Sequence, residues 1–376
     1  MIEKGRISSF QMAIIMNPAI IATGILLVPS LTAAKAERDM WISPIWGSIF
    51  GFLIVFVTFQ LHKQFPKETI IEYSEHIIGP ILGKVLGFIY LFFYLHINGI
   101  IIREYGEFVV GNFLFNTPLI VILSSMVLVC AFSVRGGLEV IARTAQIFVP
   151  IVILLWLLIM LFLLGDLDLN KMLPVLEKGV MPTILGAAGP ASWFSEYLLI
   201  AFMLPYLSDP EKGLKWGHLS VLSVLIILVI TNLTTLLLFG DITADLLYPV
   251  MNAGRYISIA EFFQHLESII MAIWIAGTFL KISIFYYALV LGTSQLLKIS
   301  DYKPIVFPIG LLLILVAKWT APNLIELKHF LGTSSVFYFL FMQIVIPTLL
   351  LIIRLLRKKL QVKRGTKSEA ISHDKT

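Results

Sequence analysis

The chain has 376 residues, of which 58% are hydrophobic and only 14% are charged, with a mean hydropathy of +0.92. A soluble domain carries roughly a quarter charged residues, so this composition excludes a soluble globular protein. The net charge of +5 comes from basic residues in short loops and at the C-terminus, which does not indicate a nucleic-acid partner, and one cysteine, Cys130, excludes an internal disulfide. Instead, apolar runs long enough to span a bilayer recur along the chain.

These runs predict an all-α integral membrane protein with about ten transmembrane helices in a single polytopic domain, residues 1–360. The helices are expected near residues 10–31, 43–61, 81–103, 117–134, 144–164, 183–206, 216–240, 266–291, 304–319 and 333–355. The first run is too long for the apolar core of a signal peptide, which has about 7–15 residues, so it is interpreted as a resident helix. Residues 361–376 are expected to form a basic, polar cytoplasmic tail.

The distribution of basic residues predicts the orientation in the membrane. With ten helices, 19 of the 28 Lys and Arg fall on the side that carries the N-terminus, eight fall on the opposite side, and Lys281 lies inside the eighth helix. Cytoplasmic flanks hold the excess of basic residues, so both termini are predicted to be cytoplasmic. The stretch from Arg354 to Lys367 either anchors the last helix or binds anionic membrane lipid.

Two groups of five helices suggest an internal symmetry. If residues 10–164 and 183–355 are related units, the odd number of helices inverts the second unit, giving the 5+5 inverted repeat of many secondary transporters. The substrate site of such proteins is formed by discontinuous helices at matching positions of the two halves. This makes the first and sixth helices the places to look for a break.

Both of these helices contain residues that interrupt a helix. The first contains Asn17-Pro18, Thr23-Gly24-Ile25 and Pro29. The sixth contains the stretch from Gly186 through Gly189-Pro190 to Ser192. Unwound segments expose N–H groups for a carboxylate and carbonyls for an ammonium group, so an amino acid suits them. The alternative is that these residues serve helix packing or kinks alone. The ligand-binding residues expected here are Thr23, Gly24, Ile25, Gly186, Gly189 and Ser192.

Ionisable residues within the predicted spans point to the same region. Glu196 and Lys281 are the clearest, because an unpaired charge inside a membrane is costly. Lys281 either occupies the place of a coupling cation and changes its protonation, or forms a fixed pair with Glu196. Ser283 and Tyr287, four residues apart on one helix face, are either ligand contacts or packing residues.

The third helix carries a second polar group, which comprises His96, Asn98, Glu104 and Glu107. Glu104 and Glu107 share a helix face, which either lines a polar pathway or holds ordinary interfacial charge at the helix end. Glycines at four-residue spacing, Gly47 and Gly51 and then Gly79, Gly83 and Gly87, predict close helix packing.

Motifs of enzymes are not found in the sequence. The stretch from Gly79 to Lys84 is one residue short of a P-loop and lacks its Ser or Thr, and neither a zinc-binding H-E-x-x-H nor a G-x-S-x-G elbow occurs. We therefore expect no enzymatic activity, no cofactor and no metal site.

Taken together, the chain resembles the B subunits of the nutrient-germinant receptors of bacterial endospores, the spore permeases. The resemblance covers essentially the whole chain. It rests on the opening Ile7-Ser8-Ser9-Phe10-Gln11, on Gly24-Ile25-Leu26-Leu27-Val28-Pro29, on Arg103-Glu104-Tyr105-Gly106-Glu107-Phe108 and on Lys281-Ile282-Ser283.

This resemblance implies a fold like that of the amino-acid/polyamine/organocation transporters and a sensor in the spore inner membrane. It further implies assembly with A and C subunits, and a small nutrient, often an L-amino acid, that triggers germination. A different class of function is an amino-acid symporter of the cell membrane, coupled to protons or sodium, which would use the same pocket. A purely structural scaffold is the third alternative.

Overall fold

The computed structural model describes the backbone of residues 2–257 and 267–373, and the side chains within these ranges up to residue 360 except that of Glu267. Every regular element in these ranges is a helix. Residue 266, where the eighth predicted helix starts, and residues 374–376 of the predicted tail lie outside the described residues.

The first half of the bundle leads from α1 to two short turns after α6. Its elements are α1 (Ser9–Ala36), η1 (Glu37–Ile42), α2 (Ser43–His62), α3 (Ile70–Ile78), α4 (Pro80–Asn112), α5 (Leu119–Gly136), α6 (Leu138–Leu163), η2 (Leu164–Asp166) and η3 (Leu169–Met172). The start of α1 follows from its sequence: Ser8 and Gln11 form a reciprocal capping box that satisfies the first free N–H groups.

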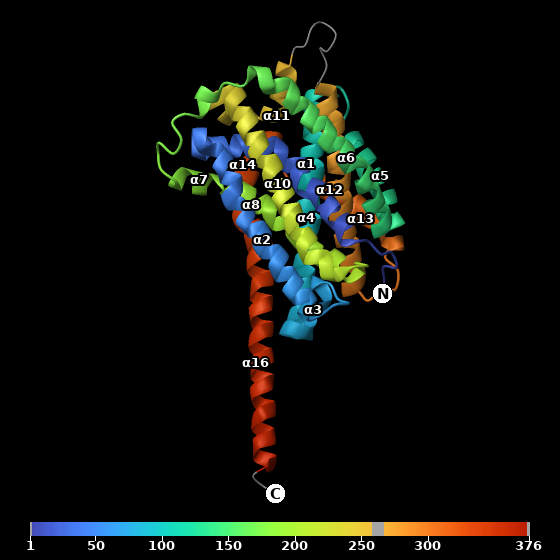
Figure 1. The fold of residues 1–376 in the computed structure, drawn as a ribbon. Helices are drawn as coiled ribbons and strands as arrows, with labels where there is room; N and C mark the ends of the chain where they lie inside the picture. The colour runs from blue at the N-terminus through green and yellow to red at the C-terminus, as the bar shows by residue number, and fades with distance from the viewer. Residues whose placement is uncertain (1, 258–266, 374–376) are drawn as a thin grey trace.

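The second half begins with a series of short pieces and ends in a long helix. Its elements are α7 (Met181–Gly186), α8 (Ala188–Ser195), η4 (Glu196–Leu199), α9 (Ile200–Met203), η5 (Leu204–Tyr206), α10 (Pro210–Phe239), η6 (Gly240–Ala244), α11 (Pro249–Tyr256), α12 (Glu267–Leu296), η7 (Lys303–Ile305), α13 (Val306–Trp319), α14 (Leu324–Gly332), α15 (Ser334–Leu340), the π-helical η8 (Phe341–Val345) and α16 (Ile346–His373). The end of α16 projects from the bundle on the side where α1 begins (Figure 1), as expected for termini on one side of a membrane.

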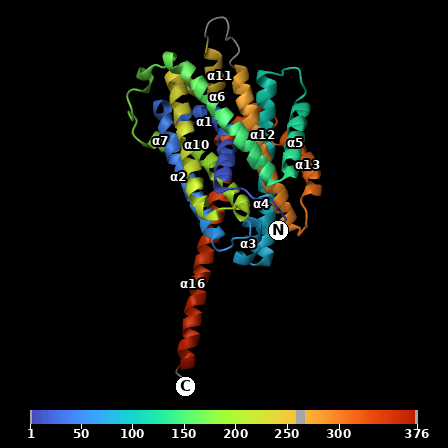
Figure 2. The ribbon, with the colours of Figure 1, turned by 45° about the vertical axis from the view of Figure 1, so that its right-hand side comes forward.

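The described helices fit an integral membrane protein. By length and composition seven helical runs can cross a membrane, or eight if the bent pair α13 and α14, at 93°, is one span. The run Ser9–His62 has 54 residues, and its length of roughly 80 Å exceeds twice the hydrocarbon core of about 30 Å. It therefore comprises two spans, α1 and α2, which run in opposite directions (Figures 1 and 2).

Each of the ten predicted segments coincides with a helix or with a chain of short helices. The sixth is divided as expected: α7 and α8 are separated at Ala187, and the helix then alternates between α and 3-10 geometry from Glu196 to Tyr206. The short helices α3, α11 and α14 lie outside the predicted spans. The division of the chain into repeats 10–164 and 183–355 stays a prediction.

The first helix differs from the prediction of a broken segment. The helix α1 continues from Ser9 to Ala36 with Pro18 and Pro29 inside it. Neighbouring helices can satisfy carbonyl groups near such residues, and the indole of Trp274 on α12 donates a hydrogen bond to the carbonyl of Ala22. The carbonyls that Pro18 and Pro29 leave without a helical donor are those of Ile14 and Ile25, so the Trp274 bond is an additional contact between α12 and α1.

The helix α1 lies at the centre of the bundle. Nearly all of its residues between Met12 and Ala36 are buried, and it packs against α10, α12, α6 and α8. The outer helices instead expose large apolar side chains, such as Ile81, Phe132 and Leu154, which suit contact with lipid chains. A polar group on α1 is therefore shielded from lipid by other helices.

Small residues allow the inner helices to approach closely, as predicted. A Cβ added to Gly47 of α2 would lie 2.7 Å from the Cβ of Pro190 on α8, and one added to Gly83 of α4 would overlap the backbone of Glu75 on α3. Gly79 does not take part in this packing. It precedes α4 with a φ of +96°, and open space surrounds the position of its missing Cβ, so it is a turn residue.

Candidate functional site

A buried ion pair joins α12 to the broken sixth helix. The Nζ of Lys281 lies 2.8 Å from Oε2 of Glu196, and the two side chains are 0% and 3% exposed. Glu196 is the first residue of η4, where the chain leaves α-helical geometry. Lys281, in the middle of the membrane-spanning helix α12, is thus paired with Glu196 in this structure, which was one of the two alternatives for this lysine.

The predicted residue Thr23 joins this pair to α1. Its Oγ1 accepts hydrogen bonds from Lys281 Nζ at 2.9 Å and from the indole Nε1 of Trp193 at 2.8 Å. The Lys281 ammonium also lies 5.6 Å from the centre of the Phe285 ring, a favourable position for a cation. One hydroxyl therefore connects α1, α8 and α12, and the site is called the Thr23–Glu196–Lys281 centre below.

The predicted glycines surround the Trp193 indole. A Cβ added to Gly24 would lie 3.5 Å from Trp193, and one added to Gly189 would lie 3.6 Å from Leu31 and 3.8 Å from Trp193. Gly186 has another role, because a Cβ there would come 2.5 Å from the Ser43 hydroxyl. Gly186 is therefore a packing residue between α7 and α2, whereas Gly24 and Gly189 leave room beside the tryptophan.

The hydroxyl of the predicted residue Ser192 is used within its own helix. Its Oγ donates to the carbonyl of Gly189 at 2.7 Å, and the side chain is buried. This bond returns to the residue three positions earlier in the same helix. In this conformation Ser192 supports the irregular helix.

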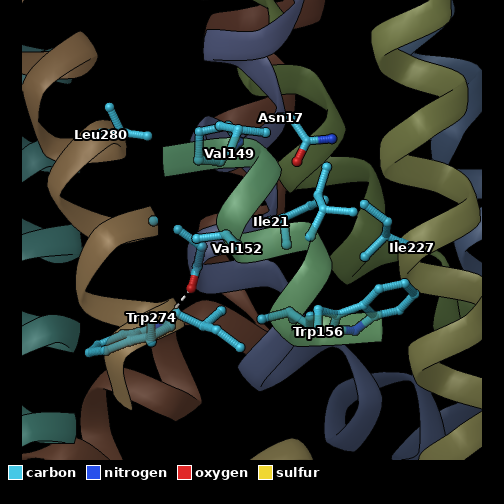
Figure 3. A pocket seen from close by; sticks show the side chains of 14 residues that line it. Asn17, Ile21, Val149, Val152, Trp156, Ile227, Trp274 and Leu280 are labelled. Carbon is cyan, nitrogen blue, oxygen red and sulfur yellow. Dashed lines mark hydrogen bonds between the residues drawn. The ribbon is translucent and has the colours of Figure 1, made fainter. Parts of the chain in front are cut away.

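An apolar cavity of about 40 Å³ lies beside the centre, between α1, α6, α10 and α12. Asn17 stands at one end and Trp156 and Trp274 at the other, as Figure 3 shows, and aliphatic side chains line the space between them. The predicted residue Ile25 is also part of the lining. The cavity suits an apolar group of a few carbon atoms.

Tyr287, predicted as either a ligand contact or a packing residue, lies away from the Thr23–Glu196–Lys281 centre. Its hydroxyl donates to Oε2 of Glu3 at 3.3 Å. Tyr287 lies six residues beyond Lys281, or about 9 Å along the helix, toward the end of the bundle where the chain begins. Ser283 is fully buried, and its hydroxyl makes no hydrogen bond with any described group.

Glu3 is the centre of a second buried polar cluster, which sequence patterns did not indicate. Its carboxylate accepts hydrogen bonds from Tyr302 at 2.9 Å and from the backbone N–H of Gly5 at 2.7 Å and Leu138 at 3.2 Å. Close by, the backbone of Ile7 exchanges hydrogen bonds with Tyr206 and Ser208 at the end of the sixth helix. The segment before α1 is thereby fixed to both halves of the bundle.

Two residues of α4 occupy different environments. The Nδ1 of His96 lies 3.4 Å from the hydroxyl of Tyr338 on α15, and its ring packs on that of Tyr338. Asn98 is fully buried, and its amide makes no hydrogen bond with any described group. A buried amide of this kind is a candidate contact for a bound molecule or water.

The charged residues near the expected end of the third helix lie inside the protein, because α4 continues to Asn112 rather than ending near residue 103. Arg103 binds Glu107 at 2.7 Å and donates to the carbonyl of Lys318 at 3.0 Å. Glu104 points elsewhere and lines a small cavity between α4, α1, α12 and α14. The two carboxylates expected on one face thus have separate surroundings.

Trp193 and Trp274 have positions in the site that sequence reasoning missed. Both are buried and donate their indole N–H to α1, at Thr23 and at Ala22. A usable signal was present, since tryptophans of membrane helices concentrate at the two interfaces and a buried indole requires an acceptor.

Comparison with known proteins identifies the family. The spore permease family, described as spore germination proteins, matches residues 6–325. The chain belongs to this family. Relatives from Bacillus subtilis (strain 168) include spore germination protein KB, 26% identical over 96% of this chain and 98% of that protein, and spore germination protein YndE, 28% identical over 94% and 98%.

Solved structures with low sequence identity share the fold of this spore permease. A Na⁺-coupled sialic acid symporter aligns with a TM-score of 0.64 at 11% identity, over 91% of this chain and 80% of the symporter. Mhp1, a nucleobase-cation-symport-1 family transporter, gives 0.67 at 12% over 88% and 76%, and MhsT in complex with L-phenylalanine gives 0.61 at 12% over 94% and 99%. The amino-acid-transporter-like fold is confirmed, and the family and fold indicate a membrane receptor or transporter rather than an enzyme.

Proposed function

We propose that this spore permease is a membrane subunit of a nutrient-germinant receptor, which binds a small nutrient near the middle of the bilayer and signals germination. An L-amino acid is the proposed ligand class. The observation that carries the proposal is the Thr23–Glu196–Lys281 centre, which lies beside an apolar cavity inside a transporter fold. Intramembrane ionisable residues are functional candidates because burying them is costly.

The chemistry of an amino acid fits these groups. An α-carboxylate can interact with the Lys281 ammonium or the Thr23 hydroxyl, while an apolar side chain can fill the cavity lined by Ile25 and Trp274. Gly24 and Gly189 place no side chain beside Trp193, and a single Cβ at either position would already be in van der Waals contact with its neighbours. Lys281 would then divide its interactions between Glu196 and the ligand.

A signal requires two conformations that bind the nutrient with different affinity. The sixth helix is suited to such a change, because its segments from α7 to η5 are short and Glu196 lies at one of the junctions. A shift of Glu196 relative to Lys281 on ligand binding would transmit a conformational change along this helix to Tyr206. Tyr206 contacts the N-terminal segment at Ile7. In the proposed setting, A and C subunits in the spore inner membrane receive the signal.

A working symporter is the second candidate, and the fold neighbours support it. One of them is a Na⁺-coupled symporter. In this function Lys281 and Glu196 belong to the coupling machinery, and the same pocket moves its ligand through alternating access. Receptor and symporter differ in net transport.

Uptake and binding by the purified protein in liposomes test the proposal. The labelled probes are L-amino acids, with Gly24→Trp as the blocking variant and Gly24→Ala as its control. A single Cβ at Gly24 stays in ordinary contact with Trp193 at 3.5 Å, whereas an indole has no room. Saturable binding without accumulation, lost in Gly24→Trp and kept in Gly24→Ala, supports the receptor.

Other results contradict the receptor. Accumulation that follows an ion gradient and disappears in Gly24→Trp makes the protein a symporter. If both variants and the wild type bind equally, the site is not at Gly24. For partners, co-purification with A and C subunits from spores supports the assembly, and purification of the full chain without them under the same mild conditions opposes it.

A further inference from the structure

A second candidate ligand site surrounds Glu104 on α4. This carboxylate is only 7% exposed and lines a small cavity together with Leu26 and Leu27 of α1, Tyr248, and Trp274 of α12. The helix α14 contributes the remaining wall, including Lys328. Among the described residues, Glu104 makes no hydrogen bond or ion pair, although such a group inside a membrane protein is normally paired.

The charges around this cavity leave one carboxylate without a partner. Glu196 is engaged by Lys281, and Glu107 by Arg103. Lys328 also lines this cavity and is only partly buried, and among the described residues no ion pair joins it to Glu104. Glu104 is therefore the carboxylate at this cavity that can accept a cationic group of a ligand.

The size and lining of the cavity define this positive group. Its volume of about 10 Å³ accommodates roughly one water-sized group, which matches a primary ammonium head. The rings of Tyr248 and Trp274 lie at the cavity and can attract a cation through their faces. A divalent metal would need several oxygen ligands, and the described residues contain no cluster of three or more metal-ligating side chains.

We propose that Glu104 binds the primary ammonium group of an organic ligand whose apolar part extends into the cavity lined by Ile25 and Val149. Trp274 lines both cavities, so a ligand that occupies both would contact this side chain. This inference deepens the proposed function, from which it takes the nutrient as the natural source of the ammonium group. It assigns that group to α4 instead of to unwound backbone of α1.

Thermal unfolding of the full chain in detergent tests the site with isobutylammonium as the probe. Isobutanol and isobutyrate are its neutral and anionic matches. The wild type should be stabilised saturably by isobutylammonium and by neither match. In Glu104→Gln the dissociation constant should rise at least tenfold. In Glu326→Gln, which removes an exposed carboxylate of α14, it should stay as in the wild type.

Several outcomes overturn the site. The site is wrong if isobutylammonium and isobutanol stabilise the wild type equally. This comparison needs no variant, so the test stays valid if Glu104→Gln fails to fold. The site is also wrong if Glu104→Gln binds isobutylammonium with the affinity of the wild type. If the affinity is equal but the pH dependence of binding is lost in Glu104→Gln, Glu104 holds a proton instead of the ammonium group. If isobutylammonium binds at Glu104 but no amino acid binds, the site is supported and the proposed nutrient is wrong. If amino acids bind equally well to the wild type and to Glu104→Gln, the proposed nutrient is supported and the site is wrong.

Discussion

Replacing Lys281 by methionine should destabilise the protein by about 3–5 kcal/mol, the range for removal of one partner from a buried ion pair. The lysine is 0% exposed, and its ammonium is held by Glu196 and Thr23 at 2.8 and 2.9 Å. Methionine fills most of the aliphatic volume, so the loss comes from the charge. Glu196 would keep its negative charge inside the bundle without a counter-ion, or would have to take up a proton.

A double variant separates this effect from packing. In Lys281→Met with Glu196→Gln neither charge remains, and replacing both partners of a buried pair by neutral groups is often close to neutral for stability. The double variant should therefore recover most of the stability lost in the single one. Unfolding in detergent, followed by tryptophan fluorescence or by helix content, gives the midpoints of the wild type, of the single variants Lys281→Met and Glu196→Gln, and of the double variant.

The result that would refute the reasoning is a single variant as stable as the wild type. It would mean that Lys281 and Glu196 are not paired in the membrane, or that Glu196 is protonated there. The control is the exposed pair of Lys178 and Glu37, with side chains 62% and 57% exposed. Lys178→Met should leave the unfolding midpoint unchanged, because solvent screens such a pair.

Three further predictions concern other contacts. Thr23→Val should cost about 2–6 kcal/mol, because two buried donors lose their acceptor at about 1–3 kcal/mol each. Thr23→Ser should retain most of the stability, and unfolding in detergent distinguishes the two variants. Gly83→Ala should destabilise the protein, since the added Cβ overlaps the backbone of α3. Gly111→Ala, with open space around the added Cβ, should be neutral or stabilising by up to about 1 kcal/mol. Equal unfolding midpoints of these two variants would contradict the close packing at Gly83. Glu3→Gln should accelerate amide hydrogen exchange in residues 3–9, while Tyr302→Phe should do so more weakly; unchanged exchange in both would show that this carboxylate does not hold the segment.

The spans could be predicted because lipid imposes a simple rule on the sequence. A membrane helix needs an unbroken apolar run, and charged or Pro/Gly-rich stretches separated ten such runs. Each coincides with a described helix or a chain of short helices, and seven or eight described helical runs have the length and composition of a span. The rule fails where a charge has a partner inside the protein. Arg103 and Glu107 end the apolar run of the third helix, but they bind each other within α4, which continues to Asn112.

The site was predictable in its types of residue and less so in its geometry. The cost of burying a charge singles out Lys281 and Glu196 from the sequence alone. The contacts of Tyr287 and Trp274 depend instead on elements distant in the sequence: Glu3 lies 284 residues before Tyr287, and Ala22 lies 252 residues before Trp274. Helical spacing places Ser283 and Tyr287 on one face, but it cannot tell which neighbours that face meets.

The attachment of the N-terminal segment has a mechanical consequence. Residues 3–9 cross from the start of α6 at Leu138 to Asp209 beyond the sixth helix. Their hydrogen bonds are spaced along this segment, at Glu3, Ile7 and Ser9. Because these bonds lie at different points along the segment, separation of the two halves at this end that peels the segment away would load and open them one at a time. Each step needs only a few hydrogen bonds to open, and a partially peeled intermediate should therefore precede full separation.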